Sequence, residues 1–127
     1  MATWQDLAYD SLHAARELRA ANRFRSSVSR SYYAAYAGLT HVLSGCPNIR
    51  FTRGRQNPSH EQLPRLISGY LDGPVSAGKH SQDLKHWIRC LRKFREEADY
   101  APRAQIGMRE AVNALRIAHA ILLRLGM

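Results

Sequence analysis

The chain has 127 residues, enough for one domain with a single hydrophobic core and too few for two. Its 45% hydrophobic and 23% charged residues exclude an extensively disordered protein, and no apolar run is long enough to cross a membrane. Lys and Arg number 19 against 10 Asp and Glu, so a formal charge of +9 favours a polyanionic partner, nucleic acid first and an acidic protein second.

Apolar spacing predicts a first helix over residues 4–21 and a second over 24–44. Thr3 is placed to cap the first helix, Asn22 can close it, and Gly45 ends the second. The second helix carries an apolar stripe and, beside it, a stripe of aromatic and hydroxyl side chains. The apolar stripe comprises Val28, Tyr32, Ala35, Leu39 and Val42, and the polar one Ser29, Tyr33, Tyr36 and Thr40.

Residues 45–58 predict a long loop, because glycine, proline and asparagine alternate there with three arginines, Arg50, Arg53 and Arg55. Ser59 and Gln62 have the spacing of a capping box and predict a shorter helix over 60–71. Two further helices are expected over 81–99 and 108–125. No strand-like alternation appears, so the sequence predicts one all-α domain over 1–127, an antiparallel bundle of four to five helices.

One position in the fourth predicted helix breaks its apolar stripe. Leu84, Ile88 and Leu91 recur at steps of four and three, and the next position in the series is Arg95. Two interpretations remain open. Asp99, four residues later, can neutralise a partly buried Arg95 as a structural pair. Alternatively, Arg95 points into a cleft facing the tyrosines of the second helix and binds phosphate there.

Three blocks of sequence together resemble the small stand-alone HEPN-domain proteins of bacteria and archaea. They are "SRSYYAAYAGLTHVL" from Ser29, "SHEQLPRLI" from Ser59, and "LRKFREEADY" ending at Tyr100. The family patterns are S-R-x-Y-Y-A-x-F-H, a block that opens with a histidine, and R-x-E-A-D-Y. Ser29, Arg30, Tyr32, Tyr33 and Ala34 match the first, His60 the second, and Arg95, Glu97, Ala98, Asp99 and Tyr100 the third.

The resemblance implies a helical bundle that usually dimerises. Many HEPN proteins are metal-independent ribonucleases whose site is an arginine followed, after four to six residues, by a histidine. Many are toxins paired with a nucleotidyltransferase-like antitoxin. This sequence departs from the nuclease pattern, because Tyr100 stands where that histidine is expected and Ala37 replaces a histidine of the first block. Neither an arginine nor an ordinary tyrosine is a ready general base at neutral pH.

We therefore expect an RNA-binding protein and a candidate metal-independent endoribonuclease, acting as a toxin or defence component with a nucleotidyltransferase-type partner. The alternative is a non-catalytic nucleotide-binding or protein-interaction module. The candidate catalytic residues are Arg95, Tyr100, Asp99 and His60. The candidate nucleic-acid- or nucleotide-binding residues are Arg30, Tyr33, Tyr36, Arg53, Arg55 and Arg92.

No cofactor or metal is expected, because the histidines lack the spacing of metal ligands. Arg55 and His60 have the arginine-to-histidine spacing of the nuclease motif, but they lie in or beside the long loop, and we treat that match as coincidence. A homodimer and a cytoplasmic location are expected. Cys46 and Cys90, far apart in the chain, suggest no disulfide framework.

Overall fold

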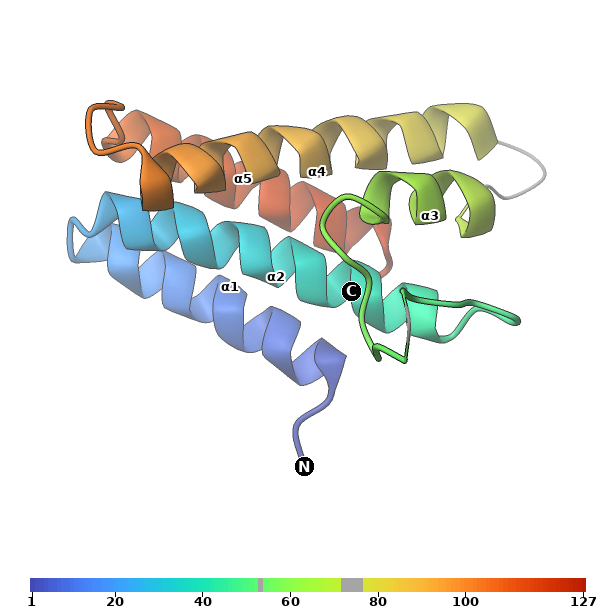
Figure 1. The fold of residues 1–127 in the computed structure, drawn as a ribbon. Coiled ribbons are helices and arrows are strands. Elements are labelled where there is room, and N and C mark those ends of the chain that lie inside the picture. The colour runs from blue at the N-terminus through green and yellow to red at the C-terminus, as the bar shows by residue number, and fades with distance from the viewer. Residues whose placement is uncertain (53, 72–76) are drawn as a thin grey trace.

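The computed structural model describes residues 1–52, 54–71 and 77–127, which form five helices and contain no strand. The helices are α1 (Trp4–Ala20), α2 (Phe24–Ser44), α3 (Leu63–Tyr70), α4 (Ala77–Tyr100) and α5 (Met108–Arg124). Figure 1 shows the long helices lying roughly alongside one another, with the short α3 beside the first half of α4. The predicted all-α fold is confirmed.

The first and last helices begin with the caps that their sequences favour. The Thr3 N–H donates to Asp6 Oδ2 at 2.9 Å, and the Asp6 N–H donates to Thr3 Oγ1 at 3.1 Å. At α5, the Gly107 N–H donates to Glu110 Oε2 at 2.9 Å. Asn22 has a φ of 61°, a left-handed conformation that asparagine tolerates, and it lies just beyond the end of α1. These features fix where the helices begin and end.

Two helices differ from the sequence prediction at their N-termini. The helix predicted from His60 begins at Leu63, because Pro64 has no N–H to donate to the His60 carbonyl and residues 60–62 form a separate turn. The predicted capping contact is present, since the Gln62 N–H donates to Ser59 Oγ at 3.1 Å. The helix predicted from Ser81 begins four residues earlier, at Ala77. Part of the segment predicted to separate α3 from α4 lies outside the described residues.

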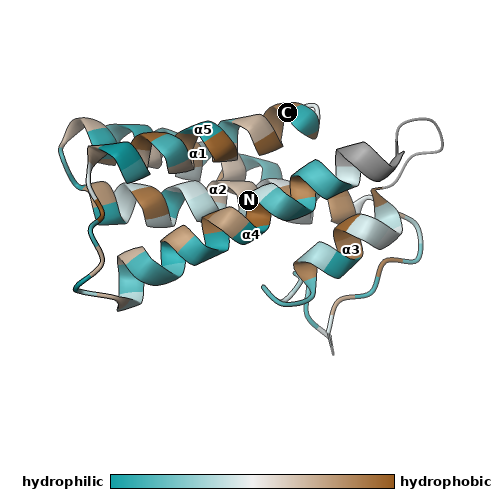
Figure 2. Cartoon of the chain, turned by 90° about the horizontal axis from the view of Figure 1, so that it is seen from above, coloured by the Kyte–Doolittle hydropathy of each residue, from teal (hydrophilic) through white to brown (hydrophobic). Residues whose placement is uncertain are grey.

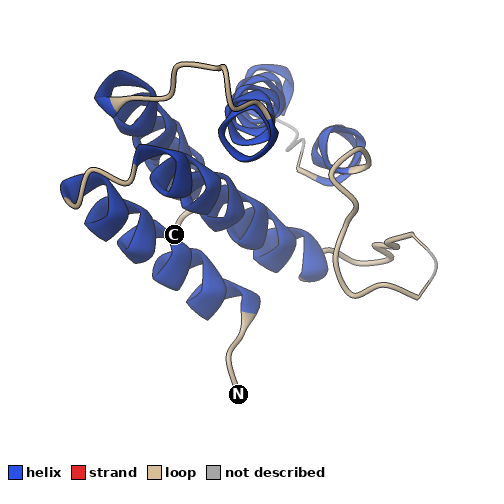
Figure 3. Ribbon diagram, turned by 60° about the vertical axis from the view of Figure 1, so that its left-hand side comes forward, coloured by secondary structure: helices blue, strands red, loops and turns tan. Residues whose placement is uncertain are grey.

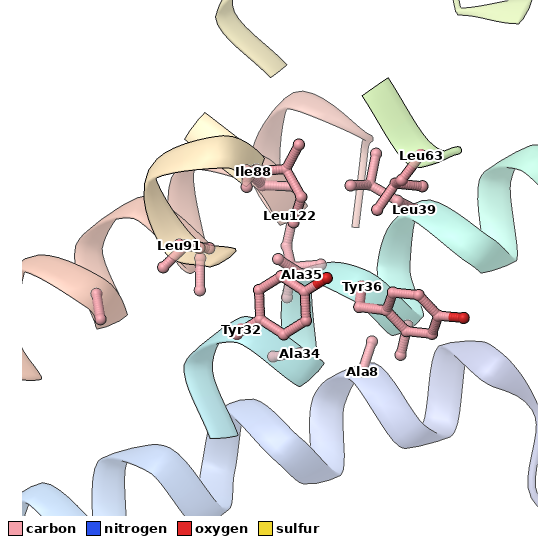
Figure 4. Close-up of a cluster of buried hydrophobic side chains, with 14 of the residues drawn as sticks. Ala8, Tyr32, Ala34, Ala35, Tyr36, Leu39, Leu63, Ile88, Leu91 and Leu122 are labelled. Atoms are coloured by element: carbon pink, nitrogen blue, oxygen red, sulfur yellow. The ribbon is translucent and has the colours of Figure 1, made fainter. Parts of the chain in front are cut away.

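α2 is the central helix and packs against the other four. Its buried side chains include Tyr32, Leu39 and Leu43, and the missing side chain of Gly38 lets Leu122 of α5 approach closely. Figure 4 shows Tyr32, Leu39, Leu91 and Leu122 gathered in this core. Arg95 follows Leu91 by one helical turn, so Arg95 lies at the end of the apolar stripe of α4 and faces the tyrosines of α2.

Most residues of α4 are hydrophilic, as Figure 2 shows, with hydrophobic positions interspersed along the helix. Figure 3 shows the long loop after α2 extending beyond the helices before the chain enters α3. None of the described helices is long and apolar enough to cross a membrane.

Candidate nucleic-acid site around Arg95

The Arg95 guanidinium is enclosed by tyrosines from two helices. Its side chain is 14% exposed, and its central carbon lies 5.5 Å from the ring centroid of Tyr33 and 5.4 Å from that of Tyr100. Nε donates to Asp99 Oδ2 at 3.0 Å, and Nη2 donates to the Tyr33 hydroxyl at 3.1 Å. The two interpretations of Arg95 are therefore compatible: it pairs with Asp99 and it also faces the aromatic side of α2.

Asp99 and Tyr100 close this cluster at the end of α4. Asp99 Oδ2 also accepts a hydrogen bond from Ser29 Oγ at 3.2 Å, which ties the end of α4 to α2. The Tyr100 hydroxyl lies 3.5 Å from Arg95 Nη2, while the residue as a whole is 70% exposed. Tyr100 thus forms an outer wall that a ligand can reach.

His60 joins the cluster from the turn before α3. Its Nδ1 lies 2.5 Å from the hydroxyl of Tyr32, whose ring centroid is 5.9 Å from the Arg95 guanidinium. Burial raises the pKa of Tyr32, so its hydroxyl stays protonated. Burial, and then the positive charges of Arg95 and Arg92, lower the pKa of His60, so its imidazole is neutral at neutral pH. Because Nδ1 is engaged, Nε2 is the ring atom left for a ligand.

A cleft of about 370 Å³ opens beside His60 and contains three arginines. It lies between α3 and α4 and is lined by Tyr32, His60, Glu61, Pro64, Arg65, Ile88, Arg89 and Arg92. Arg92 is partly neutralised, since its Nε donates to Glu96 Oε1 at 3.1 Å. Arg65 and Arg89 were not among the sequence candidates. The spacing of Arg89 and Arg92 placed both on one face of a helix, but nothing in the sequence showed that Arg65 of α3 lies opposite.

The remaining candidates differ in how accessible they are. Tyr36 is 6% exposed, and its hydroxyl donates to the Pro58 carbonyl oxygen at 2.5 Å and accepts from Asn57 Nδ2 at 2.6 Å, so it anchors the loop before α3. Arg30 and Arg55 are exposed, and the positive charge of Arg55 contributes to lowering the pKa of His60. Arg53 lies outside the described residues.

Arg25, at the start of α2, was not among the sequence candidates, and its side chain lies at the C-terminal end of α4. Its guanidinium donates five hydrogen bonds to backbone carbonyl oxygens between 2.6 and 3.2 Å. The acceptors are Glu97, Ala98, Ala101, Pro102 and Ala104. Arg25 therefore fixes the turn that carries Asp99 and Tyr100.

A family model of the HEPN domain matches residues 1–126. The chain belongs to the HEPN domain family. Neither the curated proteins nor the solved structures gave a match.

Within this HEPN domain, the fold brings a histidine towards Arg95 from a distant part of the sequence. In the nuclease pattern, a histidine can follow the arginine after four intervening residues, and here that position holds Tyr100. His60 instead contacts Tyr32, whose ring lies near the Arg95 guanidinium. His60 and Arg95 thus both contact the buried Tyr32, and His60 also lines the cleft that contains Arg65, Arg89 and Arg92.

Proposed function

We propose that this HEPN protein binds RNA, with one phosphate at Arg95 and the neighbouring phosphate in the cleft between α3 and α4. The observation that carries the proposal is that Arg95 and His60 share the neighbour Tyr32, while His60 also lines the cleft that contains Arg65, Arg89 and Arg92. Arginine suits this role because its planar fork matches the oxygens of a phosphate.

The partners of Arg95 leave it able to bind an anion. Its hydrogen bonds use Nε and Nη2, and Nη1 donates to none of the described residues. Asp99 supplies one negative charge near it, while the positive charges of Arg92 and Arg95 both act on His60. The aromatic rings of Tyr33 and Tyr100 offer faces on which bases can stack.

A specific observation also favours metal-independent cleavage: His60 is neutral and adjacent to phosphate-binding groups. In the reaction, the ribose 2′-hydroxyl loses its proton to a base and attacks the adjacent phosphorus. The bond from phosphorus to the 5′ oxygen breaks, that oxygen takes a proton, and a 2′,3′-cyclic phosphate remains. Arg95 would stabilise charge on the phosphate oxygens, and His60 would move a proton through Nε2.

The family adds a proposal about partners. HEPN domains commonly dimerise. From the family resemblance, the protein would also pair with a nucleotidyltransferase-type antitoxin as part of a toxin or defence system. The charge of +9 supports a polyanionic ligand. If RNA is not bound, the same surface suits a nucleotide or an acidic protein, and the protein is then a non-catalytic module.

Cleavage is tested by incubating a mixed RNA pool with the protein in EDTA, beside Arg95→Gln, His60→Gln and the control Lys93→Gln. Lys93 is exposed on α4 and outside the cluster. The nuclease is supported if the native protein cleaves RNA in the presence of EDTA, Arg95→Gln does not cleave it, and the rate of His60→Gln is lower by at least about 100-fold. Equal cleavage by all four proteins assigns it to a contaminant.

Binding is tested separately by titrating a labelled single-stranded RNA at increasing salt. Because bound phosphates release counterions, affinity must fall steeply with salt, and the slope must be shallower in Arg95→Gln. An affinity that is independent of salt would remove RNA from consideration and leave the interaction module.

A further inference from the structure

A second group of arginines lies on another side of the bundle, in a groove between α1 and α5. The groove has a volume of about 330 Å³ and is lined by Arg16, Arg19, Val112, Leu115, Arg116 and His119. α1 contacts neither α3 nor α4 among the described residues. Figure 2 shows α1 and α5 along one side of the molecule and α4 along the other. The groove is therefore separate from the cleft beside His60.

The positive charges that line this groove are not neutralised by acidic residues of the groove itself. None of its lining residues is acidic, and none of its three arginines forms an ion pair with a described residue. The nearby Glu17 is exposed and lies 3.0 Å from His13. Three guanidinium groups in so small a volume repel one another, so an anion between them would stabilise the arrangement.

One donor in the groove also lacks an acceptor. Arg19 Nε is buried and makes no hydrogen bond with any described residue. A buried donor without an acceptor costs about 1–3 kcal/mol. Nε is closed to solvent, so an oxyanion that enters between Arg16 and Arg116 would meet the accessible part of the Arg19 side chain rather than this atom.

The shape and chemistry of the groove favour a nucleic-acid backbone. Val112 and Leu115 are half-buried and provide an apolar floor, on which a ribose or a base can pack. A carboxylate carries one charge and is satisfied by one arginine fork, whereas successive phosphates of one strand can engage several arginines.

We propose that the α1–α5 groove is a second RNA-binding surface that holds the phosphate backbone through Arg16, Arg19 and Arg116. The inference rests on the proposed function, since it extends RNA binding from the Arg95 cluster to another side of the bundle. It predicts that phosphates contribute to affinity at two separate places on each chain.

The first test compares the affinity of a labelled single-stranded RNA for the native protein, Arg16→Gln/Arg116→Gln and Lys93→Gln. The double variant should bind more weakly at low salt, and its salt slope should be shallower by about 0.7 for each phosphate that is no longer bound. Lys93→Gln should match the native protein to within about twofold. A double variant that binds like the native protein overturns the inference and leaves the proposed function standing.

A second measurement reports the two surfaces independently, because each contains one histidine. The ring signals of His60 and His119 are followed by NMR at one pH, with and without the RNA, and are assigned with His60→Gln and His119→Gln. A phosphate bound in the groove changes the surroundings of the His119 ring, so RNA should shift its ring signals. A shift of His60 without a shift of His119 overturns the inference alone. A shift of His119 without His60 supports the groove and contradicts the proposed site, and no shift of either contradicts both.

A polyglutamate peptide provides the final comparison. If an excess of the peptide leaves the signal of His119 in its RNA-bound position, the nucleic-acid assignment is supported. If polyglutamate shifts His119 and RNA does not, the groove binds an acidic protein segment and the inference fails.

Discussion

His60 shows how a single residue in this structure acquires a pH-dependent effect on stability. Its pKa lies below the ordinary value of about 6.5 because burial and neighbouring arginines disfavour the charged imidazolium. The unfolded chain therefore takes up this proton at a higher pH than the folded chain does. Folding loses stability as the pH falls from about 6.5 towards the folded pKa, and below that value the loss is complete.

We predict that the native protein loses more stability between about pH 7 and pH 5 than His60→Gln does. Glutamine cannot titrate, so this component of the pH dependence disappears. Urea unfolding at a series of pH values measures it. Lys93→Gln is the control, because Lys93 is exposed and lies outside the cleft beside His60, and it should keep the native pH dependence. Identical pH profiles for all three proteins would contradict the arrangement around His60.

At the residue scale, the sequence identified positions whose environment is local and missed those whose environment is tertiary. The Arg95 interaction with Asp99 follows from helical spacing alone, and it is present. Arg65 belongs to the cleft only because α3 lies against α4, and Arg25 reaches carbonyls more than seventy residues away in the chain. No periodicity encodes either contact.

At the scale of the element, the end of α4 depends on a side chain from α2. Five carbonyl oxygens at the end of α4 and in the following turn accept hydrogen bonds from Arg25, and no other side chain among the described residues donates to them. A cation at a helix C-terminus also interacts favourably with the helix dipole. The turn between α4 and α5 is thereby fixed relative to α2.

We expect Arg25→Ala to lower the free energy of unfolding by about 2–3 kcal/mol, because several carbonyls lose a charged donor. Urea denaturation measures the change. Arg30→Ala is a matched control on the same helix, since Arg30 is exposed, and it should change stability by no more than about 0.5 kcal/mol. Equal effects of the two substitutions would show that the five hydrogen bonds contribute nothing beyond a surface charge.

The close approach of α2 and α5 depends on a missing side chain at Gly38. A Cβ at that position would overlap Leu122 Cδ2, and it would lie 3.3 Å from Met127 Sδ. Leu122 is 1% exposed, so it has little room to move away. Alanine normally favours a helix over glycine by about 1 kcal/mol, and overpacking a core costs about 1–3 kcal/mol.

Gly38→Ala should therefore be destabilising in the native background and stabilising in a Leu122→Ala background, where the overlapping group is gone. The free energy of unfolding of the native protein, Gly38→Ala, Leu122→Ala and the double variant, measured by heat or urea, gives a double-mutant cycle. Additive effects in the cycle would mean that Gly38 does not set the distance between α2 and α5.

The sequence predicted elements better where a cap or an apolar period marked them. The starts of α1, α2 and α5 agree with the prediction: Thr3 caps α1 as expected, and the apolar spacing marked the starts of α2 and α5. α3 is shorter because Pro64 interrupts the hydrogen bonds of its first turn. α4 begins at Ala77, before the first residue of its apolar stripe, so that stripe alone did not mark its start.

At the scale of the whole molecule, exposed apolar side chains lie at both ends of α5. Met108, in its first turn, is 47% exposed, and Tyr100, at the end of α4, is 70% exposed. Leu123, near the opposite end of α5, is 60% exposed. HEPN domains commonly dimerise. We expect the two subunits to meet beside the start of α5, which would place Met108 and Tyr100 at the interface and Leu123 away from it.

We predict that Met108→Glu converts a dimer into a monomer, because a charge buried at an apolar contact loses hydration without gaining a partner. Light scattering coupled to size-exclusion chromatography measures the mass. Leu123→Glu introduces the same charge at a comparably exposed position on the same helix, and it should leave the dimer intact. If Leu123→Glu dissociates the dimer and Met108→Glu does not, the subunits meet through the C-terminal end of α5. The Arg95 clusters of two chains would then lie apart, and each would have to bind its RNA alone.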